Sequence, residues 1–478
     1  MPHADALIVT LAGEVYTKSP RTRRRFRTVL EDNLQAAARR RGATFVADQL
    51  DAGRLLLTAD DPDAVTAAAC STFGVHRVER ARPLPGARSV DDLVSAVANR
   101  VRDRIRDRIF AVRVRRHGDH GWSSMDAERA IGSALLHDSA GVNLDDPQEV
   151  VEVLVVHDRA WLVDDSRDGP GGLPLGTQEP CLAMVSGGFD SPVAAWMLMR
   201  KGSPMDVFHL QLRCAQADHA LAVSRELWHR WGGGTSPLAW IVDFAETQAA
   251  IQREIAPAFR QVILKQLMVE AADRLADHIG APAIVTGESV GQVSSQTLRH
   301  LREIDRCCSR LMLRPLAGLD KQEIIAHART IGTHELSVRA QEVCDLSEGH
   351  RVAVAARGPE LVRARGALPA GLVDRALATL RVVALEHWFP GVDAVPVVAE
   401  PPAGALLVDV TEADIPEAKA VALTGAGAAH AASRLRAEGR DVWLVDATRR
   451  GTQAVTQRSD LTAEGLYAAA GGDRPVTA

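Results

Sequence analysis

Aromatic residues are scarce in this sequence: Phe, Trp and Tyr together make up only 4% of its 478 residues. This leaves little material for binding by base stacking, which relies on exposed aromatic side chains. No run of about twenty apolar residues occurs, so no membrane-spanning helix is expected. The first residues lack a basic region followed by an apolar core. We therefore expect no secretion signal and predict a cytoplasmic protein without a membrane partner.

Cysteine is also scarce, with six residues in all and none after Cys344. No Cys-x-x-Cys pair supports a zinc site, and the adjacent Cys307 and Cys308 are poorly placed for a mutual disulfide. In the predicted cytoplasm these thiols should be mostly reduced. The length of the chain allows two to four domains and at least one large core.

Net charge is small but unevenly distributed along the chain. Residues 1–116 hold 22 Lys and Arg against 14 Asp and Glu, which gives them a net charge of +8. Because the whole chain has a net charge of −5, residues 117–478 have a net charge of −13. A basic front on an acidic chain indicates a polyanionic partner for the front part. The alternative is a basic face that is merely solvated, and charge alone does not decide between the two.

The first 170 residues alternate short apolar runs with helical patterns. We predict strands at 7–11, 44–46, 55–58 and 75–81, and helices at 21–41 and 63–73. This order of elements is that of a ferredoxin-like unit. We then predict a helix at 90–109, a strand at 110–114, a helix capped by Ser124 and a hairpin at 150–163. The turn Arg-Arg-His-Gly at residues 115–118 is placed to grip phosphates.

After a Gly- and Pro-rich connector at residues 171–180, strands and helices alternate. Strands are predicted at 181–185, 207–212, 238–244 and 283–287, and helices at 192–199, 221–231, 257–278 and 321–331. This alternation predicts a parallel, doubly wound sheet, in which ligands lie beyond the carboxyl ends of the strands. Further on, we expect a helical stretch to residue 388, a Pro-rich linker at 395–402, and strands at 405–410, 420–423 and 442–445.

The turn Ser-Gly-Gly-Phe-Asp-Ser at residues 186–191 carries the strongest chemical signal. Its glycines let the backbone approach an anion, and the helix behind them offers unpaired N–H groups and a positive dipole end. It is not a Walker loop, because no Lys-Ser/Thr follows the second glycine. The order of residues resembles the pyrophosphate loop of ATP pyrophosphatases. An ordinary glycine turn of an α/β protein is the alternative.

Several blocks in order resemble the tRNA 4-thiouridine synthetases, also called tRNA uracil 4-sulfurtransferases. Besides the pyrophosphate loop, they include Thr-Gly-Glu at 286–288, Gly-Gln-Val-Ser-Ser-Gln-Thr at 291–297, Arg-Pro-Leu at 314–316 and Cys344. Lysidine and guanylate synthetases share the loop but would not bring the basic front domains. The resemblance implies a ferredoxin-like domain at 1–60, a tRNA-binding THUMP domain at 61–170, an ATP-pyrophosphatase domain at 171–395 and a rhodanese-like domain at 396–478.

The reaction implied by this resemblance modifies the uridine at position 8 of tRNA. The uridine O4 attacks the α-phosphate of ATP and pyrophosphate leaves. A persulfide sulfur then displaces AMP at C4 to give 4-thiouridine. The expected cofactors are ATP and Mg²⁺, and the expected partners are tRNA and a cysteine desulfurase as sulfur donor. The sequence leaves open whether the chain forms a homodimer.

The resemblance also assigns roles to individual residues. Asp190 would bind Mg²⁺ or position the phosphates, Lys321 would stabilise the adenylation transition state, and Cys344 would help resolve the sulfur transfer. Contacts to ATP are expected from Met184, Val185, Ser186, Gly187, Gly188, Ser191, Phe208, His209, Lys265, Gly287 and Gln296.

Each of these assignments has an alternative that needs no ligand. Asp190 would be a helix cap, and Lys321 a first-turn lysine. Lys265 would be a cation on a helix surface, while Phe208 and His209 would be ordinary strand residues. A lone cysteine such as Cys344 is usually inert.

The tail departs from the family pattern. By the order of elements, Thr424 occupies the position of the persulfide cysteine, and threonine cannot carry sulfur. We therefore expect a degenerate rhodanese-like domain and direct loading of sulfur onto Cys344 or a nearby thiol. The resemblance also implies thiazole synthesis for thiamine through the rhodanese cysteine, and the missing cysteine argues against that role here. The best second thiol is Cys214, followed by Cys307 and Cys308. An iron–sulfur cluster on Cys214, Cys308 and Cys344 is a weaker alternative.

The glycine-rich turn at residues 424–430 resembles the glycine fingerprint of dinucleotide-binding proteins. His430 stands where the third glycine is needed, so we reject that interpretation. Two other functions stay open: a tRNA-binding protein that has lost sulfur transfer, and transfer of AMP onto another substrate. The intact pyrophosphate loop argues against the first.

Overall fold

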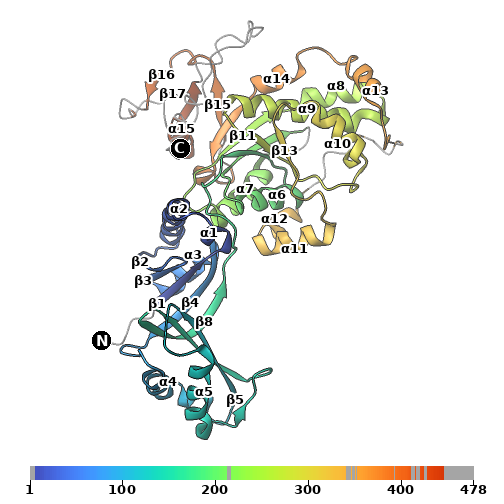
Figure 1. The fold of residues 1–478 in the computed structure, drawn as a ribbon. Helices are drawn as coiled ribbons and strands as arrows, with labels where there is room; N and C mark the ends of the chain where they lie inside the picture. Colours follow the sequence, from blue (N-terminus) through green and yellow to red (C-terminus); the bar gives the residue numbers. More distant parts are fainter. Residues whose placement is uncertain are drawn as a thin grey trace. The chain divides into compact units, whose positions relative to one another are not determined.

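The computed structural model describes residues 6–212, 217–340, 346, 350, 352–391, 393–410, 415, 420–424 and 428–445. The chain forms two compact units that divide between Pro174 and Leu175, each built on its own sheet (Figure 1). In the described part of the chain, no helix has both the length and the apolarity needed to cross a bilayer.

The first unit contains an eight-stranded sheet in the order β2-β3-β1-β4-β8-β7-β5-β6. Neighbouring strands from β2 to β7 in this order are antiparallel, and β7, β5 and β6 run parallel. The elements are β1 (Ala6–Leu11), α1 (Gly13–Tyr16), α2 (Pro20–Arg39), β2 (Phe45–Asp51), β3 (Arg54–Ala59), α3 (Pro62–Ala69), β4 (Val75–Pro83), α4 (Val90–Ile105), β5 (Ile109–His117), α5 (Ser124–Leu135), η1 (Leu136–Asp138), β6 (Gly141–Val142), β7 (Glu149–Val156) and β8 (Arg159–Asp168).

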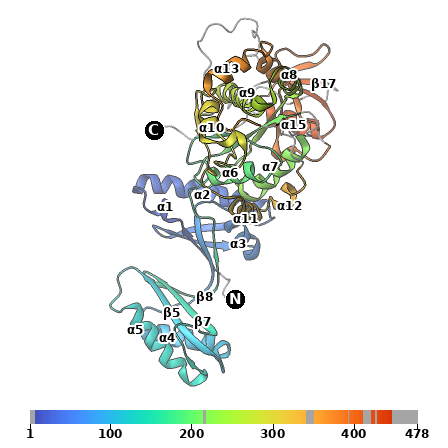
Figure 2. The same cartoon turned by 90° about the vertical axis from the view of Figure 1, so that its right-hand side faces the viewer.

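The predicted ferredoxin-like unit is confirmed: β1, α2, β2, β3, α3 and β4 follow in that order, with the strands arranged as β4-β1-β3-β2. Helix α2 starts where Ser19 accepts a hydrogen bond from the Thr22 N–H and Pro20 occupies the first turn. Its apolar face packs Phe26 and Leu30 into the core. Strand β4 also pairs with β8, so the sheet continues into the second half of the unit (Figure 2).

Two predictions for the second half of this unit need correction. Helix α4 ends at Ile105 rather than at residue 109, because Arg106 takes an extended ψ and Asp107 adopts a positive φ of 59°. The cap of α5 is Ser123 and not Ser124. Ser123 Oγ accepts from the Asp126 N–H, and the Asp126 carboxylate accepts from the Ser123 N–H in return, which is a capping box.

The second unit contains a ten-stranded sheet in the order β13-β12-β9-β10-β11-β14-β15-β18-β17-β16. Its strands are β9 (Cys181–Met184), β10 (Met205–Gln211), β11 (Leu238–Asp243), β12 (Ala283–Val285), β13 (Leu311–Leu313), β14 (Arg381–Ala384), β15 (Val395–Val398), β16 (Leu406–Asp409), β17 (Ala420–Thr424) and β18 (Asp441–Val445). Its helices are α6 (Asp190–Met199), α7 (Ala217–Trp231), α8 (Ala245–Glu254), α9 (Pro257–His278), η2 (Ser294–Gln296), α10 (Leu298–Asp305), α11 (Lys321–Ile331), α12 (His334–Ser337), α13 (Gly358–Arg365), α14 (Leu372–Ala378), η3 (Leu385–His387) and α15 (Ala428–Ala437).

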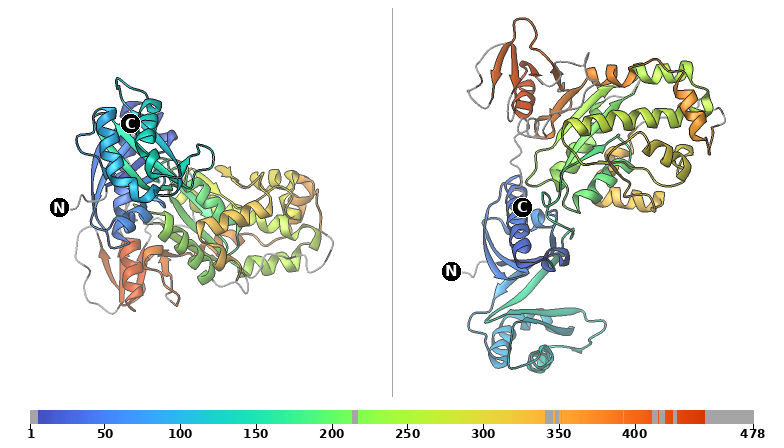
Figure 3. Two further views of the ribbon diagram at one scale, coloured as in Figure 1. Left: turned by 90° about the horizontal axis from the view of Figure 1, so that it is seen from below. Right: turned by 45° about the horizontal axis from the view of Figure 1, so that its top comes forward.

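The first five strands of this sheet form the predicted parallel, doubly wound core. They are all parallel, and the chain runs outward from β9 through β10 to β11, then returns to β12 and β13 on the other side of β9. Helices α6, α7 and α11 lie on one face of the sheet and α8, α9 and α14 on the other (Figures 1 and 3). The order therefore reverses between β9 and β12, which is the switch point where such sheets bind ligands.

The region between residues 345 and 402 is less helical than predicted. Strand β14 pairs antiparallel with β11, so the helical stretch expected to reach residue 388 ends at α14. The supposed linker contains β15, in which Val395 and Pro396 pair with β14, and Val397 and Val398 pair with β18. The prolines suggested a linker, because proline lacks the N–H that a strand donates to its neighbour. Pro396 is tolerated in β15 because it lies where the pairing of this strand passes from β14 to β18. Helices α8 and α10 and strand β13 were also missed.

The tail strands β16, β17 and β18 lie where the sequence predicts strands. They pair in parallel, and α15 packs beside them and against β14. The tail therefore extends the sheet of the second unit through β15. Its assignment as a degenerate rhodanese-like domain stays a prediction.

Candidate active site

Two loops meet at the switch point of the second unit. One is the turn at residues 186–191 between β9 and α6, and the other begins at Gly287 after β12. A Cβ atom at Gly287 would lie 2.6 Å from both the Asp190 carbonyl carbon and the Ser191 nitrogen. Only glycine permits this approach, because the atoms it would meet belong to the backbone. Ser186 and Gly287 thus lie at the same end of the sheet, as predicted.

Serine hydroxyls fold the 186–191 turn onto itself. The Ser186 N–H donates to Ser191 Oγ over 3.0 Å, and Ser191 Oγ donates to the Ser186 carbonyl over 3.2 Å. A Cβ at Gly187 would collide with the His219 ring, whereas one at Gly188 would meet only Ser186 Oγ, at 3.8 Å. The turn is therefore closed on the Gly187 side and open at Gly188, where an anion has room to approach.

Asp190 is held by side chains from two distant segments. Lys321 Nζ lies 2.6 Å from Asp190 Oδ1, and Gln292 Nε2 donates to Asp190 Oδ2 over 3.0 Å. Lys321 also lies 5.6 Å from the centroid of the Phe189 ring. Asp190 is not the cap of α6, since the capping position belongs to Phe189, whose side chain makes no capping hydrogen bond. The helix-cap alternative is wrong.

The position of Lys321 is set by its own helix start. Asp320 caps α11 in a capping box with Glu323, so Lys321 is the first helical residue, as the alternative reading proposed. That same placement directs its ammonium group to Asp190, which is 131 positions away in the chain. Gln292 was not predicted as a site residue, although it lies in one of the motif blocks.

Strands β9 and β10 bring together the four residues expected to frame the nucleoside. Met184 pairs with Phe208, and the Val185 N–H donates to the Phe208 carbonyl over 2.9 Å. The Phe208 ring is fully buried in the core. His209 Nδ1 lies 3.0 Å from the Val185 carbonyl, and its buried Nε2 has no hydrogen-bond partner in the described part of the chain. Burial lowers the pKa of His209, so the ring is neutral at pH 7 and Nδ1 donates.

Lys265 lies beside a buried carboxylate, Glu288. Lys265 Nζ is 3.9 Å from Glu288 Oε1, and Arg314 Nε donates to Glu288 Oε2 over 2.8 Å. Gln296 Oε1 and Ser295 Oγ are buried and have no hydrogen-bond partner among the residues that the structure describes. Neither Glu288, Arg314 nor Ser295 was predicted as a site residue, although all belong to the motif blocks.

These features fit a nucleotide. The orphaned polar atoms of His209, Ser295 and Gln296 offer hydrogen bonds to a polar ligand, and the close approach at Gly287 shapes a narrow cradle. Among the described residues, no group of three or more His, Cys, Asp or Glu side chains could hold a metal ion. Mg²⁺ usually takes one or two carboxylates and completes its shell with substrate phosphates and water. A single carboxylate such as that of Asp190 therefore fits a Mg²⁺ ion bound together with a nucleotide.

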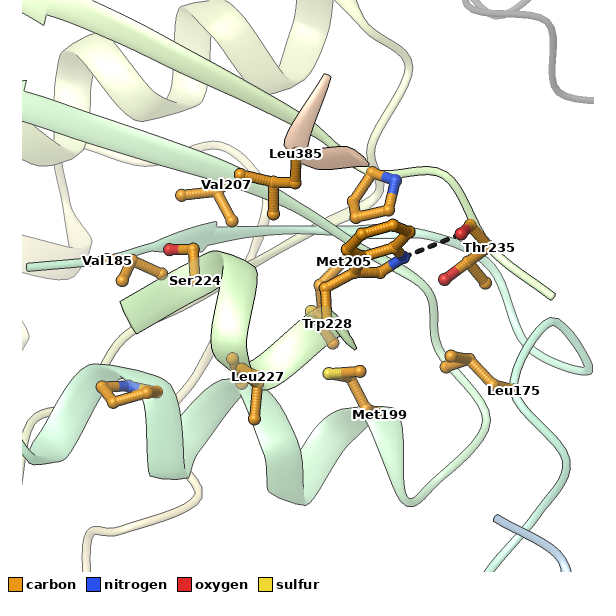
Figure 4. A pocket seen from close by; sticks show the side chains of 13 residues that line it. Leu175, Val185, Met199, Met205, Val207, Ser224, Leu227, Trp228, Thr235 and Leu385 are labelled. Atoms are coloured by element: carbon orange, nitrogen blue, oxygen red, sulfur yellow. Dashed lines mark hydrogen bonds between the residues drawn. The ribbon is translucent and has the colours of Figure 1, made fainter. Parts of the chain in front are cut away.

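A small cavity lined in part by Val185 and Pro192, which flank the turn, has a different character (Figure 4). It measures about 20 Å³ and is lined mainly by apolar side chains from β10, α6 and α7, with Trp228 donating to the Thr235 carbonyl over 2.8 Å. This volume holds about one water molecule. It is a packing void and not a nucleotide pocket.

Two of the cysteines named as sulfur acceptors lie outside the described residues, namely Cys344 and Cys214. Cys308 Sγ lies 3.3 Å from Asp273 Oδ1, and burial together with this carboxylate raises the pKa of its thiol to about 11. Burial also raises the pKa of Cys307, although Arg365 Nη1 lies 3.4 Å from its sulfur. Neither thiol is activated, because the thiolate is the reactive form.

The first unit carries a basic hollow of its own. It has a volume of about 460 Å³ and is lined by Thr10, Arg54, His76, Arg77, Val114, Arg115, Arg116, His117 and Ser124. Among the described residues, Oγ1 of Thr10 and Nε of Arg54 are buried without a hydrogen-bond partner, although Arg54 Nη1 pairs with Asp51 at 2.7 Å. Arg77 Nε lies 3.6 Å from Asp168 Oδ1. These donors suit an anion.

The motif predicted to grip phosphates contributes to this hollow, but mainly from a strand. Arg115, Arg116 and His117 belong to β5, and the chain turns only at Gly118, whose φ is 105°. Arg115 is tied to buried Glu79 and to Glu152, so it is only partly available. Burial and the neighbouring Arg54 guanidinium lower the pKa of His117, which leaves the arginines as the cations of the hollow.

Comparison with known proteins places these features in context. The family described as Thiamine biosynthesis protein (ThiI) matches residues 176–366, and the THUMP domain matches residues 87–165. The chain is 38% identical over 427 residues to a tRNA sulfurtransferase of Desulfurococcus amylolyticus, which covers 88% of this chain and 87% of that protein. It is 36% identical over 354 residues to a tRNA sulfurtransferase of Shewanella baltica, covering 70% and 71%.

The fold matches a solved structure of similar extent. A 4-thiouridine synthetase in complex with RNA and with bound ATP superposes with a TM-score of 0.67, over 80% of this chain and 99% of that one. The sequence identity is 22%, so the likeness is one of fold.

Proposed function

Because this chain belongs to the tRNA sulfurtransferase family, it is a sulfurtransferase that acts on tRNA, and we propose that it uses ATP to convert uridine 8 to 4-thiouridine. The observation that carries the proposal is the pairing of Lys321 with Asp190 at the start of α6, beside the open Gly188 turn. A cation, a carboxylate and a helix N-terminus converge there, as the transfer of a nucleotidyl group requires.

The adenylation step follows from this arrangement. The turn at residues 186–191 holds the β- and γ-phosphates of ATP, and the uridine O4 attacks the α-phosphate. Lys321 then exchanges its contact with Asp190 for the phosphate oxygens, where negative charge develops as pyrophosphate leaves. Asp190 would hold Mg²⁺ together with phosphate oxygens, and the ion would neutralise charge on the leaving group. The orphaned Nε2 of His209 and Oε1 of Gln296 serve as hydrogen-bonding positions for the nucleoside.

Sulfur reaches the activated uridine in the second step. We assign the thiol of Cys344 to this step, with sulfur supplied by a cysteine desulfurase, because Thr424 ends β17 where a rhodanese cysteine would stand. The outer sulfur of a Cys344 persulfide bonds to C4 and AMP departs. A second thiol then attacks the Cys344 sulfur and breaks the S–S bond, which releases 4-thiouridine and leaves a disulfide that an external thiol reduces before the next turnover. The raised pKa values of Cys307 and Cys308 argue against either as the assisting thiol, which leaves Cys214.

The first unit is assigned the binding of tRNA. Its hollow is lined by Arg54, Arg77, Arg115 and Arg116, and phosphates of the RNA backbone are the anions that guanidinium groups contact best. The predicted domain bounds at residues 60, 170 and 395, the cytoplasmic location and the homodimer remain part of this proposal.

The test measures 4-thiouridine in tRNA from a strain deleted for this protein. We expect the nucleoside to disappear on deletion and to return with the wild-type chain but not with Cys344→Ala. Unchanged 4-thiouridine in the deletion strain would contradict the enzyme function and favour a tRNA-binding protein that has lost sulfur transfer. Full rescue by the cysteine variant would contradict only the role of Cys344. Pyrophosphate release that ignores added tRNA would favour AMP transfer onto another substrate.

A further inference from the structure

Glu288 joins three separate segments of the second unit through one buried carboxylate. Its side chain is 5% exposed, and its Oε2 accepts hydrogen bonds from Thr286 Oγ1 at 3.1 Å and from Arg314 Nε at 2.8 Å. Its Oε1 faces Lys265 Nζ at 3.9 Å. These partners come from the end of β12, the loop after β13 and the middle of α9.

A carboxylate this deeply buried persists only with opposite charge beside it. Arg314 supplies the stronger contact and is itself tied to Asp305 Oδ1 at 2.6 Å. Lys265 is the outer cation of the group, with a side chain that is 24% exposed. At 3.9 Å its ammonium is attracted to Glu288 without being committed to a hydrogen bond, so its N–H groups stay available to a ligand.

Glu288 is also adjacent to the tightest backbone contact of the site. The preceding residue, Gly287, abuts the Asp190–Ser191 peptide at the start of α6. A displacement of the Glu288 side chain would therefore move the loop that forms one wall of the phosphate turn. The hydrogen bonds from Thr286 and Arg314 resist that displacement.

We propose that Glu288 is a positioning residue for ATP: it fixes the Lys265 ammonium group and the Gly287 loop in the arrangement that binds the nucleotide. This rests on the proposed ATP site. Without the negative charge, the long Lys265 side chain samples many rotamers, and ordering it on binding costs affinity. Glu288 itself does not touch the reacting atoms.

The first experiment compares Glu288→Gln with a matched control, Asp305→Asn. The glutamine keeps an acceptor for Thr286 and Arg314 but removes the charge that faces Lys265. The control removes the other carboxylate of Arg314 and leaves Lys265 untouched. We expect Glu288→Gln to weaken binding of a non-hydrolysable ATP analogue, and to raise the KM for ATP, by roughly five- to tenfold. The KM of Glu288→Gln for tRNA should stay unchanged. For Asp305→Asn, both the affinity for the ATP analogue and the KM for ATP should stay within twofold of wild type.

A second measurement separates positioning from loss of structure. Lys265→Met should weaken analogue binding by itself, and adding Glu288→Gln to it should weaken binding little further, because both changes act through one group. If Glu288→Gln does not fold, Glu288→Asp keeps the charge but retracts it from Lys265, and the same test applies. Wild-type analogue binding by the Glu288 variants, or additive losses in the double variant, would overturn the proposal.

Failure of the proposed function gives a different result. A wild-type chain that binds the analogue but makes no 4-thiouridine would contradict the sulfurtransferase reaction. The dependence of analogue binding on Glu288 would still be measured in that chain, since the binding assay needs neither tRNA nor a sulfur donor.

Discussion

The two units of this chain use different chemical groups at the sites where we expect anions to bind. The hollow of the first unit offers guanidinium side chains from β3, β4 and β5. The site of the second unit relies on a glycine turn, a helix N-terminus and a single Lys–Asp pair. Side-chain charges spread over three strands suit a long polyanion, whereas backbone groups fixed by secondary structure suit one small ligand in one pose.

This contrast predicts that removing the positive charge of Lys321 in the second unit nearly abolishes 4-thiouridine formation. Lys321→Met should lower kcat for 4-thiouridine formation about 10²- to 10³-fold, because the phosphate charge that develops in the transition state loses its cation. Binding of tRNA should stay at the wild-type level in a filter assay. Lys201→Met, at the far end of α6, is the control and should retain activity. A kcat for Lys321→Met within threefold of wild type would contradict the assignment.

The close backbone contact at Gly287 predicts a loss of nucleotide binding without any change of charge. Gly287→Ala places a methyl group where the Asp190–Ser191 peptide lies, so the KM for ATP should rise tenfold or more, at a cost in stability of about 1–3 kcal/mol. Gly318→Ala is the control, since nothing lies within 4 Å of its added Cβ and it sits in the same unit. Equal ATP affinities in the two variants would show that the approach at Gly287 is not required.

In the first unit, we expect smaller effects that depend on salt. Arg54→Gln and Arg77→Gln should each weaken tRNA binding about three- to tenfold and reduce the slope of log K against log salt by about one. The KM for ATP should not change. Arg253→Gln on α8 controls for loss of a surface charge. The comparison between the units fails if the hollow variants alter ATP affinity but not tRNA affinity.

The smallest effect is expected at the opposite end of β10 from the nucleotide site, and it concerns stability alone. Burial raises the pKa of Asp206 to about 6, although its carboxylate accepts hydrogen bonds from Leu238 and Trp240. As pH rises from 3.8 to about 6, the unfolded chain loses this proton first, so the folded state loses stability. Asp206→Asn should therefore raise the free energy of unfolding by about 1–2 kcal/mol at pH 7.5 and by less at pH 4.5.

Urea titrations of wild type and Asp206→Asn at the two pH values measure this difference. Activity per folded molecule should be equal, because Asp206 is the second residue of β10 and the nucleotide site lies beyond the other end of that strand. An equal gain at both pH values would show that the titration of Asp206 does not cause it.

Local sequence patterns were sufficient for most of the fold. The bounds of α9 and α11 agree with the predicted ranges, because proline or a capping box sets their starts and the apolar pattern sets their lengths. The prediction was wrong for β14 and β15, whose partners lie far away in the chain. Their strand character comes from pairing with β11 and β18, which no local pattern encodes.

By itself, the sequence determined that a glycine turn follows a buried strand and starts a helix, and that the front of the chain is basic. Both follow from residues close together in the chain, through backbone freedom, helix capping and summed charge. Only the tertiary structure decided that Lys321 and Gln292 hold Asp190, that Glu288 joins Lys265 to Arg314, and that Gly287 abuts α6. These contacts span long sequence separations, and their geometry exists only after the parallel sheet has brought the strand ends together.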